Sequence, residues 1–342
     1  MERSSFTLDL GAIRRNAATL LRAAEGAELW AVVKADGYGH GAVDVSRAAL
    51  AAGARALCVT TVQEALALRG ERALDDAAIV VLGPVSDDDV ADARSARLQL
   101  VVGGGPVPEG VPVHLKLDTG MGRWGFSELP SPGRDVAGVM SHLAAAESDA
   151  EFTALQIDRF RKATAELDDA LVRHLANSAG TLRYPGAAFD AVRCGVALYG
   201  ISPFGADPAL DGLEPALRWE SYVALVKLLQ PGESTGYGRR YLAREPTWIG
   251  IVPIGYADGF RRDLTGTEVL VEGERRRVVG TVSMDAIAVE IGRELAVGAS
   301  VTLIGDGILV EDHARVADTI GYEIATGLDT GSGRASRVVR DG

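Results

Sequence analysis

Short apolar runs alternate with longer amphipathic stretches up to about residue 200, and this alternation limits the folds open to the chain. The runs are predicted to be strands, and most are rich in Val, Ile, Leu and Ala, as strands buried on both faces are. They are Leu29–Val33, Ala56–Thr61, Ala78–Leu82, Leu98–Val102, Val113–Leu117, Gly138–His142, Val172–Leu175 and Ala191–Val196. Strands that alternate with helices predict an α/β fold. Eight of them favour a (β/α)8 TIM-type barrel over a doubly wound open sheet, although the count alone does not decide.

Helical patterns separate these strands. In the first, Ile13, Ala17, Leu20 and Leu21 fall on one face of a helix. The predicted helices are Ala12–Ala24, Ala42–Ala52, Val62–Arg69, Asp87–Ser95 and Ala150–Leu167.

From about residue 215 the strands follow one another closely, with turn residues and no long helix between them. This pattern predicts a mostly antiparallel β-domain with one helix, Val310–Ile320. The predicted strands are Val223–Leu229, Thr247–Pro253, Glu268–Leu270, Arg277–Val282, Ala286–Ile291 and Ser300–Leu303.

Composition argues against several partners. The formal net charge is -12 at pH 7, and phosphate binding needs clustered Lys and Arg, so no nucleic acid partner is expected. No apolar run approaches about 18 residues and the first residues lack a continuous apolar stretch, so we expect no membrane span and a cytoplasmic location. The histidines show no metal-ligand spacing, and Cys58 and Cys194 form no CxxC pair, so no metal site is expected.

The stretch AVVKADGYGHG, residues 31–41, carries the strongest indication of chemistry. Lys34 follows an apolar run, where a barrel strand would end, and barrels build active sites at that end. Gly37, Gly39 and Gly41 let the backbone turn sharply and approach a ligand. A poorly solvated lysine amine has a lowered pKa and can attack a carbonyl carbon. Taken alone, Lys34 also fits a solvated lysine at a strand end.

The stretch resembles the lysine motif of the alanine racemases, which are fold-type III enzymes that use pyridoxal 5'-phosphate (PLP). Further strings resemble the family in the same order, from about residue 4 to about residue 290. They are SSFTLDLGAIRRN, TTVQEALALR, HLKLDTGMGRWG, SHLA, LANSAG, VRCGVALYG, STGYGRRY, VPIGYADGF and GTVSMDAIAV. The resemblance implies a PLP-binding barrel over residues 11–214, a β-rich domain over 215–342, and an N-terminal strand in 1–10 that joins that domain.

By resemblance, two residues carry the chemistry. Lys34 binds the PLP aldehyde covalently and takes the α-proton of D-alanine. A racemase moves protons on both faces of a planar carbanion, so a second base is expected. The resemblance gives that role to Tyr237, which acts on L-alanine from the second subunit of a head-to-tail homodimer. A phenol with an ordinary pKa of about 10 is a weak base at neutral pH, and His142 resembles the histidine linked to that tyrosine and to the cofactor.

The resemblance also implies the contacts of PLP. Arg193 matches the arginine that faces the pyridine nitrogen; because arginine keeps its proton, that nitrogen stays unprotonated and the ring is a weaker electron sink. Tyr38 and Ser178 match phosphate contacts, and the backbone of Gly195 and Val196 matches another. Outside their strings, Arg193 also fits a salt-bridge arginine and Ser178 a helix N-cap.

The implied substrate is alanine, with serine as an alternative because a small cavity selects small side chains. Arg123 matches the arginine that contacts the substrate carboxylate. Lys116 matches a lysine that is often carbamylated and then holds this arginine; alternatively, Lys116 pairs with a nearby acid. Met284 and Asp285 match the substrate side of the second subunit, and Tyr256 matches an entry-gate tyrosine.

The C-terminus departs from the family pattern. Many relatives carry a Tyr-Arg pair after a Tyr-Glu-Ile or Tyr-Glu-Val string, and that tyrosine contacts the phosphate. Here the string is Tyr322-Glu323-Ile324, and Gly333 precedes Arg334. We therefore expect one phosphate contact to be missing or replaced.

Three other functions remain open on the sequence. A non-catalytic PLP-carrier protein shares the Lys34 region but lacks a second domain, and the strings around Tyr237 and Met284 argue against it. A basic amino-acid decarboxylase uses a cysteine late in the chain, whereas none follows Cys194. A broad-specificity or serine racemase fits the same strings.

Overall fold

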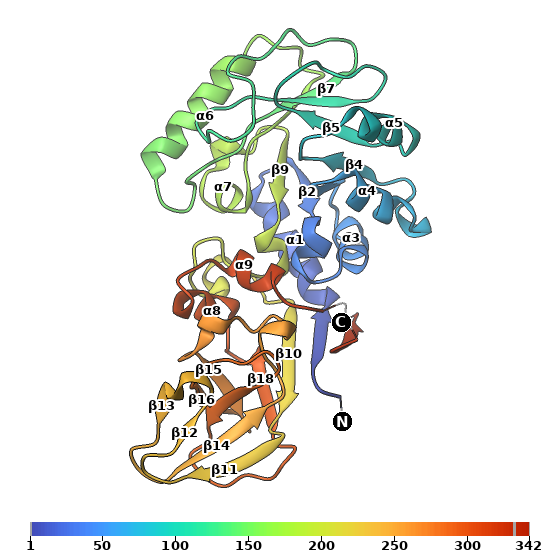
Figure 1. The fold of residues 1–342 in the computed structure, drawn as a ribbon. Helices are drawn as coiled ribbons and strands as arrows, with labels where there is room; N and C mark the ends of the chain where they lie inside the picture. The colour runs from blue at the N-terminus through green and yellow to red at the C-terminus, as the bar shows by residue number, and fades with distance from the viewer. Residues whose placement is uncertain (1, 331–332, 342) are drawn as a thin grey trace.

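The predicted barrel is present in the computed structural model, which describes residues 2–330 and 333–341 (Figure 1). Eight parallel strands pair in chain order, and β2 pairs with β9 to close the barrel. They are β2 (Glu28–Val32), β3 (Ala56–Val59), β4 (Ala78–Val81), β5 (Gln99–Val102), β6 (Val113–Lys116), β7 (Val136–Met140), β8 (Val172–His174) and β9 (Ala191–Cys194). Each overlaps a predicted strand, so the (β/α)8 fold is confirmed. The pairing of β2 with β9 rules out the open sheet.

The surrounding helices begin where side chains satisfy their first N–H groups. The Asp9 carboxylate accepts a hydrogen bond from the Ala12 N–H at 3.0 Å, and Thr61 and Glu64 form a capping box. The helices are α1 (Leu10–Ala23), α3 (Ala42–Ala51), α4 (Val62–Arg69), α5 (Asp87–Ser95), α6 (Ala150–Thr164) and α7 (Ser178–Arg183). The first five confirm the predicted helices, whereas α7 is too short to show a periodic pattern. Within the described ranges, no helix is long and apolar enough to span a membrane.

A nine-stranded sheet dominates the second domain, in the order β11-β14-β17-β16-β15-β18-β10-β1-β19. Its strands are β1 (Ser5–Asp9), β10 (Leu217–Tyr222), β11 (Leu225–Leu229), β14 (Thr247–Val252), β15 (Glu268–Val271), β16 (Glu274–Val279), β17 (Ile287–Glu290), β18 (Ser300–Ile304) and β19 (Ser336–Arg340). The six predicted strands and their antiparallel pairing are confirmed. Strands β10 and β19 have no counterpart in the predicted pattern.

The first strand ties the two ends of the chain to this sheet. β1 pairs antiparallel with β10 and parallel with β19, and in Figure 1 it runs beside both. The Phe6 ring stacks on Trp219 with 5.1 Å between ring centroids, and both side chains are buried. Aromatic packing of this kind fixes β1 in the second domain although α1 follows it directly in the barrel.

The helix predicted over Val310–Ile320 is wrong in extent. It is divided into α8 (Val310–Val316) and α9 (Gly321–Thr326). Asp318 adopts a left-handed φ of 50°, and the Thr319 N–H donates back to the Ala314 carbonyl at 2.9 Å. This bond is typical of a Schellman cap, which ends a helix with one left-handed residue. That residue is usually glycine, and here it is Asp318.

Candidate active site

Nine of the predicted site residues line one cavity of about 530 Å³ at the carboxyl ends of the barrel strands. They are Lys34, Tyr38, Lys116, Arg123, His142, Ser178, Arg193, Gly195 and Val196. These residues come from several strands and the turns that follow them. Parallel strands bring their carboxyl ends to the same face of the barrel, so residues far apart in the chain converge there.

Lys34 starts a strained turn after β2. The following residues, Ala35, Asp36, Gly37 and Tyr38, all have positive φ between 49° and 61°. Only glycine adopts such values at low cost, so neighbouring groups must hold the turn. The Asp36 carboxylate accepts from the Ala42 N–H at 2.8 Å, and a Glu64 carboxylate oxygen accepts from the Ala35 N–H at 2.7 Å.

The turn places Lys34 in the cavity wall, where its surroundings shift the amine toward the neutral form. Burial lowers the pKa of Lys34, and the positive charge of Arg123 lowers it further. A neutral amine carries the lone pair that a nucleophile or a base needs.

One end of the cavity forms a cradle of hydroxyl groups and backbone. The Ser178 hydroxyl oxygen accepts from the Gly195 and Ala197 N–H groups at 3.2 and 3.4 Å, and its hydrogen can point to the Cys194 sulfur or to a ligand. A Cβ at Gly195 would lie 2.4 Å from the Tyr38 hydroxyl oxygen, so only glycine fits there. The Tyr322 ring from α9 lies 6.1 Å from the Tyr38 ring. Neither phenol hydroxyl bonds to any residue that the structure describes, so both are free to bind an anion.

Arg193 is buried and is held by acceptors around both terminal nitrogens. Nη1 donates to the carbonyl and Nδ1 of His174, both at 2.9 Å. Nη2 donates to the Ser141 and Leu175 carbonyls at 2.7 and 3.1 Å, and His142 Nδ1 lies 3.3 Å from it. Among the described residues the Nε–H has no acceptor, so it is the donor left for a ligand. Burial lowers the pKa of Arg193 to about 10, and the group stays cationic at neutral pH.

Lys116, at the end of β6, lies beside a second cation. Burial lowers the pKa of Lys116 most, and the positive charge of Arg123 lowers it further, to about 8. The Trp124 ring lies 5.5 Å from Lys116 Nζ and 5.2 Å from Arg123 Cζ. No carboxylate of the described chain forms an ion pair with either cation. The alternative partner Asp118 accepts instead from the Gly120 and Gly122 N–H groups.

Sequence reasoning did not single out four residues of the cavity wall that carry polar groups, Thr60, Trp124, Asn177 and Thr326. Trp124 directly follows Arg123, and Asn177 directly precedes Ser178. Trp124 and Asn177 lie within strings that resemble the family, and this could have identified them from the sequence.

Four predicted residues lie outside this cavity, on the second domain. The side chains of Tyr237, Met284 and Tyr256 are 71%, 52% and 43% exposed, and Asp285 is also exposed. Tyr237 begins a short turn between the two-residue strands β12 (Ser234–Thr235) and β13 (Tyr241–Leu242). All four side chains are open to solvent in the single chain, so they are available to contact a second molecule.

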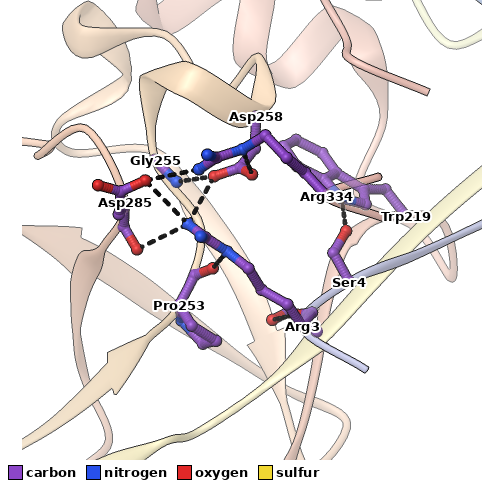
Figure 2. A network of polar contacts seen from close by, with 9 residues as sticks. Arg3, Ser4, Trp219, Pro253, Gly255, Asp258, Asp285 and Arg334 are labelled. Atoms are coloured by element: carbon purple, nitrogen blue, oxygen red, sulfur yellow. Dashed lines mark hydrogen bonds and ion pairs between the residues drawn. The ribbon is translucent and has the colours of Figure 1, made fainter. Parts of the chain in front are cut away.

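An ionic cluster holds the turns that carry Tyr256 and Met284 (Figure 2). The buried Asp258 carboxylate accepts from Arg3 at 3.0 Å, from Arg334 at 2.8 Å and from the Gly255 N–H at 2.8 Å. Both arginines also contact the Asp285 carboxylate. The cluster thus joins the two ends of the chain to the two turns.

Replacing Asp258 with alanine should destabilise the protein by about 2–3 kcal/mol. The change leaves the Gly255 N–H without its acceptor and removes one of the carboxylates that each arginine contacts. The cost stays below that of a fully buried pair because both arginines are partly exposed and keep Asp285 as a partner. Chemical denaturation measures it. Asp158→Ala, which removes an exposed helix ion pair with Lys162, is the matched control and should cost under about 1 kcal/mol. Equal losses in the two variants would refute the structural role of the cluster.

Comparison with known proteins identifies the family. Residues 8–203 match the family model "Alanine racemase, N-terminal domain", and residues 216–339 match "Alanine racemase, C-terminal domain". The alanine racemase of Lactiplantibacillus plantarum is 40% identical over 95% of this chain and 95% of its own.

Solved structures agree with the sequence match. The alanine racemase of Streptomyces coelicolor A3(2) superposes with a TM-score of 0.90 at 38% identity, covering 99% of this chain and 98% of that one. The Bartonella henselae alanine racemase, solved with covalently bound pyridoxal phosphate, gives a TM-score of 0.88 at 27% identity over 99% of this chain and all of that one. The chain therefore belongs to the alanine racemase family.

Proposed function

We propose that this protein interconverts L- and D-alanine with PLP as its cofactor. The observation that carries the proposal is the single cavity in which a desolvated lysine, a buried arginine and a hydroxyl cradle meet. Family membership over nearly the whole chain supports the same activity and cofactor.

The cavity fits PLP at three points. The Tyr38 and Ser178 hydroxyls and the Val196 N–H would hold the phosphate. The Gly195 N–H would join them by giving up its present bond to Ser178. The Arg193 Nε–H would face the ring nitrogen, and the Lys34 amine would bind the aldehyde. Tyr322, beside Tyr38, is our candidate for the phosphate contact that Gly333 does not supply.

When bound, PLP supplies the electron sink that makes the α-hydrogen of the amino acid acidic. Arg193 cannot give up its proton, so it donates a hydrogen bond without protonating the ring. The Lys34 amine takes or returns the α-proton on its own face. Arg123 would bind the substrate carboxylate, and membership of the alanine racemase family supports alanine as the amino acid that it binds.

The opposite face needs a second base, and we propose that a second copy of the chain supplies it. Tyr237 would act on L-alanine from that copy, next to His142, whose Nδ1 lies 3.3 Å from Arg193 Nη2. Met284 and Asp285 would approach the substrate with it, and Tyr256 would line the entry. The exposure of these side chains in the single chain supports a head-to-tail homodimer.

Steady-state rates with L-alanine, L-serine and L-arginine test the activity. We expect kcat/KM to be highest for L-alanine, with D-alanine as product and no carbon dioxide released. Comparable rates with serine would indicate the broad-specificity alternative. Bound PLP without racemisation would revive the carrier protein.

We also expect the Lys116 amine to take up carbon dioxide as pH rises through about 8. Only the neutral amine reacts, and the pKa of Lys116 is lowered to about 8 by burial and Arg123. The carbamate would turn a like-charge neighbour of Arg123 into an anion that holds it. Carbon-13 NMR of the holoenzyme in labelled bicarbonate measures the adduct. A signal that persists in Lys116→Ala, or that is absent across this range, would contradict the assignment.

A further inference from the structure

A chain of three buried or half-buried side chains runs from Arg193 through the interior of the barrel. Arg193 Nη1 lies 2.9 Å from His174 Nδ1, and His174 Nε2 lies 3.0 Å from His114 Nδ1. His114 Nε2 then lies 2.7 Å from the side-chain oxygen of Gln99. Gln99 begins β5, so the chain connects the amino-terminal end of that strand to the arginine at the cavity.

The chemistry of arginine fixes the direction of every hydrogen bond in this chain. A guanidinium group only donates, so His174 Nδ1 must accept and His174 Nε2 must carry the hydrogen. His114 Nδ1 accepts that hydrogen, so His114 Nε2 carries its own and donates it to Gln99. The reversed tautomers would point two N–H groups at each other between His174 and Arg193.

We propose that Gln99 and His114 are positioning residues that hold His174 as an acceptor and thereby fix the orientation of Arg193. This inference rests on the proposed role of the Arg193 Nε–H toward the cofactor ring. Once both Nη atoms are engaged, rotation of the planar guanidinium is blocked and the Nε–H stays directed to the ligand.

The surrounding residues confine both imidazole rings and keep them neutral. Both rings pack against Trp30, at centroid distances of 5.5 Å for His114 and 4.5 Å for His174. A Cβ at Gly138 would lie 2.5 Å from His114 Nδ1, so the β7 backbone also confines that ring. Burial, and then the charge of Arg193, lower the pKa of His114 to about 4 and that of His174 well below its ordinary value. Both rings are therefore neutral at neutral pH.

Nitrogen-15 NMR of the holoenzyme, labelled only at histidine, tests the tautomers directly. We expect His114 and His174 each to show an unprotonated Nδ1 and a protonated Nε2. These signals should not change between about pH 6 and about pH 8. A protonated Nδ1 in either residue, or a cationic ring, would overturn the proposal. Racemisation by the same preparation is measured in parallel, so this outcome would leave the proposed function standing.

Two substitutions of similar length at Gln99 separate positioning from packing. Gln99→Glu keeps an acceptor for His114, whereas Gln99→Met removes it. We expect Gln99→Met to mix the tautomers, to shift the visible absorption of bound PLP, and to lower kcat roughly tenfold with KM nearly unchanged. Gln99→Glu should keep the wild-type tautomers and absorption. Equal behaviour of the two variants, whether both impaired or both normal, would overturn the positioning role.

Discussion

Replacing Lys34 with alanine should abolish racemisation in both directions, lowering kcat by at least about 10³-fold. The change removes both the amine that binds the cofactor aldehyde and the base on one face of the substrate. Chiral chromatography of the products from L- and D-alanine measures the loss. Lys34→Arg should be as inactive, because a guanidinium keeps the charge but cannot lose its proton.

The matched control is Lys162→Ala, since that side chain is 76% exposed and pairs on the surface with Asp158. Wild-type rates are expected there. If Lys34→Ala kept activity within about tenfold of wild type, the amine would not be the base that general acid–base catalysis requires.

Replacing Tyr237 with phenylalanine should lower racemisation by about 10²–10⁴-fold, the usual contribution of one general base. The loss should be one-sided when proton exchange is measured in deuterium oxide. Lys34 can still remove the α-proton of D-alanine and return a deuteron to the same face, so D-alanine should exchange without inversion. L-alanine should not exchange.

Mixing the two inactive variants tests whether the base comes from the other subunit. A dimer of one Lys34→Ala chain and one Tyr237→Phe chain then has one site with both native bases and one site with neither. Random reassociation should restore about a quarter of wild-type activity, because half of the dimers are mixed and each has one active site. No recovery in verified mixed dimers would place Tyr237 in its own chain's site.

Much of this site follows from local sequence and one topological rule. Lys34 directly follows an apolar run and Lys116 lies near the end of another, and a parallel barrel gathers those ends on one face. The glycines after Lys34 indicate a tight turn, which the structure shows as consecutive residues with positive φ. Once the fold is known, residues that are far apart in the sequence can be assigned to one cavity.

Contacts between distant segments could not be predicted from the sequence. The histidine spacing excluded a metal motif but did not show that His114 and His174 meet, because their bond depends on the stagger of strands in the closed barrel. Arg3 and Asp285 are likewise brought together only because β1 joins the second domain. The end of α8 depends on a left-handed Asp318, a backbone choice that its side chain does not require.

The proposed function depends on a bond between Lys34 and the cofactor aldehyde. Borohydride reduction of the PLP-loaded protein, followed by proteolysis and mass spectrometry, makes that bond permanent and locates it. We expect the phosphopyridoxyl group on the peptide that contains Lys34, together with loss of the visible absorption. A label on Lys116, Lys162 or Lys227 with Lys34 unmodified would contradict the central claim.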